Sequence, residues 1–311
     1  MSRIITLTLN PSVDKSTRIA GLQPDRKLRC SAPIYEPGGG GVNVSRAIRK
    51  LGGTSECVYL AGGARGALLR DLLDQEAIVQ HVVPTQGETR ENFMVVDTLT
   101  EQQYRFVMDG PTHSEAEWRE SLAVLASRVA AGDYVVASGS LSSGVPTDYY
   151  AQVVKIVQQK KAKIIVDTSG EALQRATETG VYLLKPNLGE LSSLTSQEAI
   201  TAPDQERLAH QLIEQGRAKL VVVSLGAQGA LLMTDQGVEY VTAPTVHKRS
   251  TVGAGDSMVA GMVLRLAQDA SPLEAVRYGV ACGTAATMNY GTQLCRKEDV
   301  DRLYQWMVQS A

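Results

Sequence analysis

Four short segments made almost entirely of apolar residues limit the possible folds of this chain more than any other feature. They are residues 134–137 (YVVA), 163–166 (KIIV), 181–184 (VYLL) and 220–223 (LVVV). Nearly continuous apolar runs of this length are typical of parallel strands that are covered on both faces. Residues 3–9 (RIITLTL) are also strand-like. We therefore expect a mostly parallel sheet that is covered on both sides.

Helical patterns lie between these strands. Trp118, Leu122, Leu125 and Val129 recur at the spacing of one helix face, and residues 44–51 and 259–266 carry similar apolar faces. A strand followed by a helix, repeated along the chain, is typical of an α/β fold with right-handed crossovers.

Two stretches depart from this rhythm, at residues 15–35 and 89–107. In the second, residues 93–96 and 103–107 are β-rich and are separated by a mostly polar segment, which predicts an antiparallel hairpin. Together the two stretches predict a small sheet that serves as a lid or as a pairing surface. No repeat or linker divides the chain, so we expect residues 1–311 to form one domain.

Composition narrows the classes of function. The 31 Lys and Arg residues nearly balance the 33 Asp and Glu residues, which argues against a nucleic-acid coat or a polybasic membrane binder. No apolar run approaches the roughly 20 residues of a membrane span, and the first residues do not read as a signal peptide. The four cysteines form no CxxC pair, so we expect a reducing, cytoplasmic location.

The first glycine-rich segment is Gly38 to Gly41, followed by the helical pattern of residues 44–51. Glycines let the backbone approach a ligand closely, and a helix N-terminus favours anions. The segment matches neither the phosphate-loop nor the dinucleotide-binding fingerprint. A tight turn and a ligand-binding loop both remain open from the residues alone.

The second segment, residues 250–257 (STVGAGDS), also precedes a helical face. The backbone N–H groups of Gly253, Ala254 and Gly255 would suit the charge on a transferring phosphoryl group. Asp256 beside them could take a proton from an attacking hydroxyl, or could simply cap the helix. A helix N-terminus lowers the pKa of a carboxylate, which predicts a weak base; phosphoryl transfer tolerates one.

In their order and separation, residues 38–44 (GGGGVNV) and 251–256 (TVGAGD) resemble the two signatures of the ribokinase-like (PfkB-type) sugar kinase family. The resemblance covers essentially the whole chain. It implies a three-layer α/β sandwich with a mostly parallel central sheet and a small β-sheet lid. Residues 89–92 (TREN) resemble the segment with which the phosphosugar branch of the family holds its substrate's phosphate.

Residues 24–30, 101–108 and 289–295 resemble the 6-phosphofructokinases of that branch. This implies ATP-dependent phosphorylation of fructose 6-phosphate at its 1-hydroxyl. Residues 10–11 also resemble the start of 1-phosphofructokinases and tagatose-6-phosphate kinases, so those two activities stay open. A non-catalytic sugar-phosphate sensor is the alternative from another class, and the intact Asp256 argues against it.

The resemblance also implies roles for individual residues. In the sugar-phosphate site, Asp14, Gly38, Gly39 and Asn43 would bind the sugar, Arg90 and Lys27 the 6-phosphate, and Ser140 would add a hydroxyl. The nucleotide would contact Lys185, Asn187, Ser224, Gly226, Gly229 and Thr284. Asp256 would activate the 1-hydroxyl, and the amides of residues 253–255 would hold the γ-phosphate.

Two cations and a second subunit follow from the same resemblance. Mg²⁺ would bridge the ATP phosphates, with Glu190 either near it or capping a helix. A potassium-type site would draw on Ser250, Val252, Ala286, Asn289 and Gly291, largely through backbone oxygens. The lid would pair two chains into a homodimer. Leu188-Gly189 departs from the family pattern, so ATP affinity and inhibition by excess ATP are not implied. Gln293 stands where the family usually has arginine, so details near the cation site are not implied either.

Each of these residues has a structural alternative when it is taken alone. Arg90 could be a solvated arginine on a hairpin edge, Asp14 could cap a turn, and Ser140 could be an ordinary loop hydroxyl. Lys185 could be an exposed charge at a strand end. Asp167 closes the run at residues 163–166 and is more typical of a turn than of a catalytic group.

Overall fold

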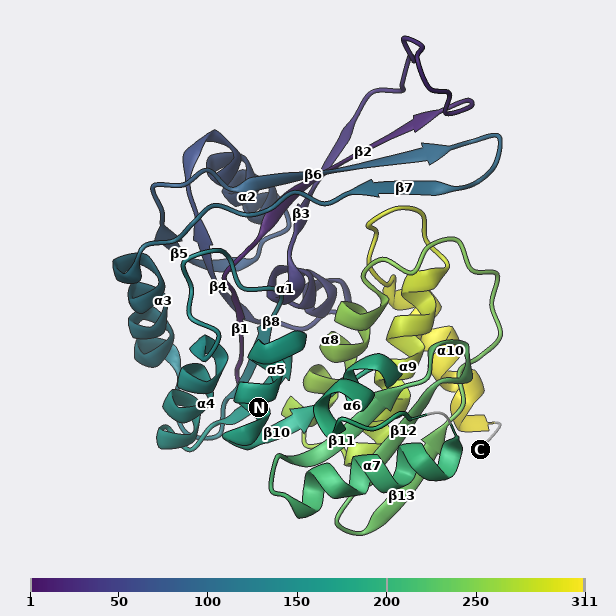
Figure 1. The fold of residues 1–311 in the computed structure, drawn as a ribbon. Coiled ribbons are helices and arrows are strands. Elements are labelled where there is room, and N and C mark those ends of the chain that lie inside the picture. Colours follow the sequence, from purple (N-terminus) through teal and green to yellow (C-terminus); the bar gives the residue numbers. More distant parts are fainter. Residues whose placement is uncertain (1, 200, 310–311) are drawn as a thin grey trace.

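The computed structural model describes residues 2–199 and 201–309, and its centre is a nine-stranded sheet (Figure 1). The strand order is β13-β12-β11-β10-β9-β8-β1-β4-β5. The strands are β1 (Ile4–Thr8), β4 (Glu56–Ala61), β5 (Val79–Pro84), β8 (Tyr134–Ser138), β9 (Lys163–Asp167), β10 (Val181–Leu184), β11 (Ala218–Ser224), β12 (Ala230–Thr234) and β13 (Gly237–Val241). Pairing is parallel from β5 to β11 and antiparallel from β11 to β13. The predicted mostly parallel sheet is confirmed.

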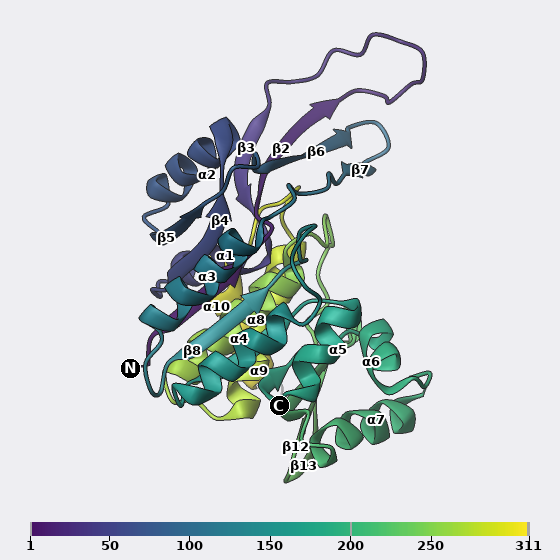
Figure 2. The same ribbon diagram turned by 60° about the vertical axis from the view of Figure 1, so that its left-hand side comes forward.

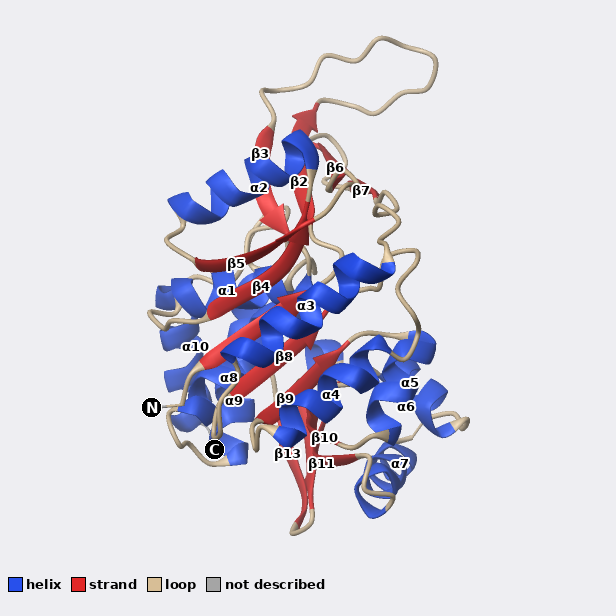
Figure 3. Cartoon of the chain, turned by 90° about the vertical axis from the view of Figure 1, so that its left-hand side faces the viewer, coloured by secondary structure: helices blue, strands red, loops and turns tan. Residues whose placement is uncertain are grey.

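Helices cover both faces of this sheet (Figures 2 and 3). One face packs against α1 (Gly40–Lys50), α8 (Ala254–Ala267), α9 (Pro272–Thr287) and α10 (Lys297–Gln309). The other packs against α3 (Glu115–Arg128), α4 (Tyr149–Gln159), α5 (Gly170–Glu178), α6 (Leu188–Thr195) and α7 (Ala202–Glu214). Val135 and Val136 are neighbours in β8 but lie in opposite cores, which explains why the run is apolar throughout. The expected three-layer sandwich is therefore observed.

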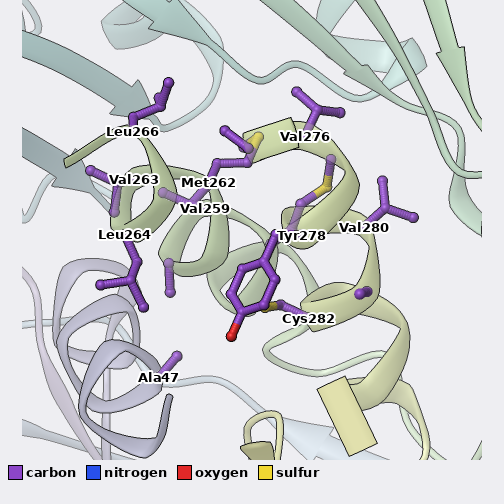
Figure 4. Close-up of a cluster of buried hydrophobic side chains, with 14 of the residues drawn as sticks. Ala47, Val259, Met262, Val263, Leu264, Leu266, Val276, Tyr278, Val280 and Cys282 are labelled. Carbon is purple, nitrogen blue, oxygen red and sulfur yellow. The ribbon is translucent and has the colours of Figure 1, made fainter. Parts of the chain in front are cut away.

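The packing of α8 against α9 fixes the place where α8 begins. Val259 and Met262 of α8 lie in one buried cluster with Tyr278 and Cys282 of α9 (Figure 4). A Cβ atom on Gly261 would come within 2.5 Å of Cys282 Sγ, so the two helices are in close contact. A well-packed core of this kind resists displacement, so residues at the N-terminus of α8 are held firmly.

A second, four-stranded sheet projects from the carboxyl end of the central sheet (Figures 1 and 2). Its order is β3-β2-β6-β7, with β2 at Ser12–Ile19, β3 at Ile34–Gly38, β6 at Arg90–Asp97 and β7 at Gln103–Phe106. The predicted hairpin is confirmed as β6 and β7, which are antiparallel. β2 runs parallel to β6 and places Asp14 beside Asn92.

The remaining helix, α2 (Gly63–Gln75), packs near this junction, where Leu69 and Leu73 join a smaller buried cluster with Val13 and Val42. Across residues 2–199 and 201–309, none of the helices has the length and apolar character that a bilayer crossing requires.

Candidate active site

The glycine segment is pressed against the ends of two central strands. α1 begins at Gly40, and Gly39 before it has a φ of +108°. A Cβ atom on Gly40 would come within 2.2 Å of Ser138 Oγ, and one on Gly41 within 2.5 Å of Thr8 Oγ1. Contacts this short exclude any side chain at these two positions. The tight-turn interpretation thus accounts for Gly40 and Gly41.

Gly38 and Asn43 face polar groups of the site instead. A Cβ atom on Gly38 would come within 2.4 Å of Asp14 Oδ2, so the Asp14 carboxylate lies against the Gly38 backbone. Asn43, in the first turn of α1, donates from Nδ2 to Asp256 Oδ2 at 2.9 Å. This hydrogen bond joins two motifs that are 213 residues apart in the sequence.

Asp256 is the third residue of α8 and does not act as its N-cap. The N-cap is Gly253, with a φ of +71° and no side chain to contribute. Among the hydrogen bonds of the described residues, the Asp256 carboxylate accepts from Asn43 and not from the backbone of its own helix. The Asp256 side chain is therefore turned towards α1, while the amides of Ala254 and Gly255 remain at the helix start.

The prediction that the helix N-terminus would make Asp256 a weak base is wrong. Burial and the nearby Asp167 carboxylate raise the pKa of Asp256 to about 6, and the Asn43 hydrogen bond and Lys185 offset only part of the effect. Desolvation disfavours a charged carboxylate, and it is the largest cause of this rise. Asp256 is therefore a stronger base than the sequence indicates, and it is still ionised at neutral pH.

Lys185 is a buried cation beside this group. Its side chain is 7% exposed, and its Nζ lies 3.4 Å from Asp167 Oδ1, which rules out the exposed-charge interpretation. Burial alone would lower the pKa of Lys185, but the carboxylates of Asp167 and Glu190 raise it above its ordinary value. Nζ lies 3.8 Å from where a Cβ atom of Gly255 would be. A lysine ammonium next to the start of α8 suits a phosphate ligand.

The loops that follow β10 and β11 lie side by side. Ser224 N donates to Pro186 O at 2.9 Å, and Ser224 forms an isolated bridge with Asn187. Gly226 and Gly229 have φ values of +61° and +102°. A Cβ atom on Gly229 would come within 1.9 Å of Val241 O, so this turn needs glycine at position 229. Because both loops follow carboxyl ends of neighbouring parallel strands, they form one edge where a nucleotide could lie. Thr284, in α9, makes no side-chain contact with these loops among the described hydrogen bonds.

Glu190 caps its own helix. Asn187 Oδ1 accepts from Glu190 N at 2.9 Å, and Glu190 Oε2 accepts from Asn187 N at 2.9 Å. This reciprocal capping box at the start of α6 is the structural alternative that the sequence left open for Glu190. Burial raises the pKa of Glu190, and the backbone hydrogen bond and Lys185 act against this rise.

The small sheet carries a small hollow, lined by polar and charged side chains together with Phe93, Met94, Phe106 and Val107. Asp14 Oδ1 accepts from Ser12 Oγ at 2.7 Å and from Asn92 Nδ2 at 2.8 Å, so Asp14 is part of β2 and does not cap a turn. Arg105 and Thr292 also line this hollow. Sequence reasoning did not select Arg105, although a cationic residue within the predicted hairpin is a signal that could have identified it.

Arg90 is held by the backbone of two loops. Nη1 donates to Met108 O at 3.1 Å and Nη2 donates to Asn10 O at 3.0 Å. Its Nε is buried and has no hydrogen-bond partner in the described part of the chain. Burial lowers the pKa of this arginine, while Asp14 and Asp109 act in the opposite direction. A fixed guanidinium with an unused N–H group suits an anionic ligand better than a solvated surface role.

Ser140 and Lys27, two of the expected substrate residues, lie in different parts of the structure. Ser140 is exposed after β8, and its Oγ accepts from Asn10 Nδ2 at 3.2 Å, which brings it close to the Arg90 contacts. Lys27 is exposed in the loop between β2 and β3. Arg90 pairs with Ser12 at the start of β2, so the whole length of that strand separates it from Lys27. Within one chain, Lys27 and Arg90 are not brought together.

The residues expected around a monovalent cation do meet. Ser250 Oγ donates to Gly291 O at 3.0 Å, and Val252 N donates to Ser250 Oγ at 3.2 Å. Asn289 Nδ2 donates to Leu294 O at 3.0 Å, and Asn289 N donates to Ala286 O at 3.2 Å. These contacts bring the Ser250 hydroxyl to the Gly291 carbonyl oxygen, in the loop that follows α9. Oxygen ligands of this kind fit a potassium-type ion.

Fold and site together describe a sugar kinase, and the family comparison agrees. Residues 5–299 match the model of the pfkB family carbohydrate kinases, so the chain belongs to that family. It is 44% identical over 308 residues to the ATP-dependent 6-phosphofructokinase isozyme 2 of Escherichia coli, covering 99% of both chains. The Mycobacterium tuberculosis protein of the same name is 43% identical over 303 residues, which cover 97% of this chain and 89% of that one.

Solved structures of the Escherichia coli protein have the same fold. Its phosphofructokinase-2 in complex with potassium superposes with a TM-score of 0.96 at 44% identity, covering 99% of this chain and 100% of that one. The complex of that protein with fructose 6-phosphate gives a TM-score of 0.94 at 42% identity with the same coverage. The expected family and fold class are confirmed.

Proposed function

We propose that this protein is an ATP-dependent 6-phosphofructokinase, which converts fructose 6-phosphate to fructose 1,6-bisphosphate. The observation that carries the proposal is the placement of Asp256: a carboxylate with a pKa of about 6, held by Asn43 at the amide-rich start of α8. A base at this position has a task in phosphoryl transfer and none in simple binding. The relatives that act on or bind fructose 6-phosphate support the choice of sugar.

In this reaction Asp256 takes the proton from the 1-hydroxyl as that oxygen forms a bond to the γ-phosphorus of ATP. The bond from that phosphorus to the bridging oxygen breaks, and ADP leaves with its electron pair. Negative charge on the transferring group is offset by the backbone amides of residues 253–255 and by the ammonium of Lys185. Since phosphoryl transfer depends mainly on positioning and charge, these residues supply what the reaction needs.

The two cations have separate places in the proposal. Mg²⁺ would come with ATP and would supply positive charge against the phosphates. Asn187 and Glu190, at the start of α6, are the residues of this chain that would lie near it. Potassium would be held by the loops that carry Ser250 and Gly291, where the Gly291 carbonyl oxygen lies against the Ser250 hydroxyl shortly before α8 begins. The relative crystallised with potassium supports this site.

The sugar phosphate would lie between the small sheet and the start of α8. Asp14 and Asn43 would bind hydroxyls, and Arg90 would bind the 6-phosphate, with Ser140 and Arg105 beside them. Lys27 needs a neighbouring chain to take part.

A homodimer that pairs through the small sheet would supply the neighbouring chain. Exposed apolar side chains on this sheet support such a dimer. Ile34 is 59% exposed and Val107 61% exposed. Burying such side chains favours association. The proposed location is cytoplasmic, where ATP and sugar phosphates are available.

A comparison of substrates tests the proposed function. We expect Mg-ATP-dependent ADP release to be fastest with fructose 6-phosphate, and faster in potassium chloride than in tetramethylammonium chloride of equal ionic strength. Tagatose 6-phosphate and fructose 1-phosphate are the controls, compared by kcat/KM. A preference for either of them would keep the mechanism and move the specificity. Binding of a sugar phosphate without turnover would identify a sensor and contradict the proposal.

At acid pH, the fall of kcat/KM (the acid limb of its pH profile) is expected to reflect protonation of Asp256. The carboxylate must be ionised to take a proton, so kcat/KM should fall as the pH drops through its pKa of about 6. Asp167→Asn removes a negative charge that raises this pKa and leaves Lys185 to lower it. The limb should therefore move to lower pH, measured from about pH 5 to about pH 8.

The exposed Asp148, at the start of α4, offers the matched control Asp148→Asn, which should leave the limb in place. A limb that stays fixed or moves to higher pH in Asp167→Asn would contradict the assignment of Asp256 as the titrating base.

A further inference from the structure

Gln103 joins the small sheet to one of the loops of the proposed potassium site. It is the first residue of β7, and its Nε2 donates to Arg249 O at 3.2 Å. Its Oε1 accepts from Ser250 Oγ at 3.2 Å. One carboxamide thus holds both a carbonyl and a hydroxyl of the 249–252 loop, 146 and 147 residues further along the chain.

Gln103 is also placed to act on the sugar-phosphate hollow. Side chains alternate between the two faces of a strand, so Gln103 and Arg105 share one face of β7. Arg105 lines the hollow together with Asp14 and Thr292. A contact that fixes Gln103 therefore also fixes the strand that carries Arg105. The sequence analysis did not assign a role to either residue.

The hydroxyl of Ser250 has two competing acceptors. It lies 3.2 Å from Gln103 Oε1 and 3.0 Å from Gly291 O, and it accepts a hydrogen bond from Val252 N. Ser250 is buried, so this proton cannot turn to bulk water. A serine hydroxyl has one proton to donate. A stronger bond to Gln103 therefore requires a weaker one to Gly291.

Other contacts between the small sheet and the same loops do not depend on this proton. The ring of Tyr290 lies under the guanidinium groups of Arg18 and Arg249, at 5.1 and 4.5 Å from its centroid. Thr292 Oγ1 donates to Glu36 Oε2 in β3. Exposed cation–π pairs are weak contacts. They keep the small sheet near the loops, whereas the contact through Gln103 responds to what the Gly291 carbonyl binds.

We propose that Gln103 is a positioning residue that couples the cation site to the sugar-phosphate site. A potassium ion that takes up the Gly291 carbonyl leaves the Ser250 proton for Gln103, and β7 with Arg105 is then fixed beside the hollow. The inference rests on the cation site of the proposed function. By linkage, potassium and the sugar phosphate must each raise the affinity for the other by the same factor.

Hydrogen–deuterium exchange of the full chain without nucleotide or sugar tests the coupling directly. Potassium chloride is compared with tetramethylammonium chloride at equal ionic strength. In the parent protein we expect potassium to slow exchange in residues 249–252 and in residues 103–106 together. In Gln103→Leu it should slow exchange only in residues 249–252. Gln102→Leu is the matched control, because exposed Gln102 bonds to Tyr104 in its own hairpin, and it should behave as the parent does.

Calorimetric titration with fructose 6-phosphate in the same two salts measures the affinity. Potassium should tighten binding by about 5–10-fold in the parent and in Gln102→Leu, and by less than about 2-fold in Gln103→Leu. The proposal would be overturned if potassium tightened binding in Gln103→Leu as much as it does in the parent. It would also be overturned if potassium did not slow hydrogen exchange of residues 103–106 in the parent protein. Absence of sugar-phosphate binding in both salts would contradict the proposed substrate, while the exchange result would still decide the coupling.

Discussion

Asp256→Asn is expected to lower kcat by a factor of about 10²–10⁴, with KM for both substrates little changed. An amide cannot take the hydroxyl proton, but it keeps the size of the side chain and can still accept from Asn43. The pKa of Asp256 is raised in the folded protein, so its ionised form disfavours folding at neutral pH. The melting temperature of the variant should therefore not fall. Steady-state kinetics at about pH 8 and thermal unfolding give the two measurements.

Asp235→Asn is the matched control, because this carboxylate is exposed in the turn between β12 and β13. It should keep the activity of the parent. If turnover of Asp256→Asn stayed within a few-fold of that of the parent, Asp256 would not be the base. A large loss of activity together with a large fall in melting temperature would also contradict the expected result.

Arg90→Ala is expected to raise KM for fructose 6-phosphate by a factor on the order of 10², and KM for ATP by no more than about 3-fold. The Arg90 guanidinium is fixed by Met108 O and Asn10 O, and its Nε has no partner among the described residues. Charge-assisted hydrogen bonds to a phosphate are strong, and alanine removes all of them. Initial rates with each substrate varied in turn measure both constants.

Arg65→Ala controls for the loss of a positive charge near the same strand, because Arg65 is exposed and pairs with Glu88 and Glu91. Its two KM values should stay close to those of the parent. Arg90→Lys keeps the charge and loses the planar fork, so it should recover only part of the affinity. Equal rises in both KM values in Arg90→Ala would argue that Arg90 supports the fold and does not hold the phosphate.

The fold could be predicted where burial on both faces left a direct trace in the sequence. Val135 and Val136 pack into opposite cores, and that requirement produces an apolar run that can be recognised without coordinates. β13 gives no such signal, because most of its residues are exposed at the edge of the sheet. The start of β2 could not be predicted either, since Ser12 and Asp14 are polar residues that are typical of a turn.

The two glycine motifs and Asp256 could be predicted because each depends on neighbours in the sequence. The pKa of Asp256 could not, since it depends on burial in the folded chain and on Asp167 and Lys185, which lie at the ends of other strands. A role for Asp167 beside Asp256 could not be predicted either, because its position at a strand end suggests only a turn. Gln103 was missed for the same reason: its partners are in a loop that only the folded chain brings near.

The short contacts of Gly40 and Gly41 have a consequence for how such an enzyme can diversify. These glycines touch Ser138 and Thr8 at the ends of central strands, so any change there disturbs the core as well as the site. The polar groups of the proposed sugar-phosphate site come mainly from the small sheet, which is attached to one end of that core. Over generations, selection can therefore alter which sugar is accepted by changing this sheet, while the apparatus that moves the phosphoryl group is inherited unchanged.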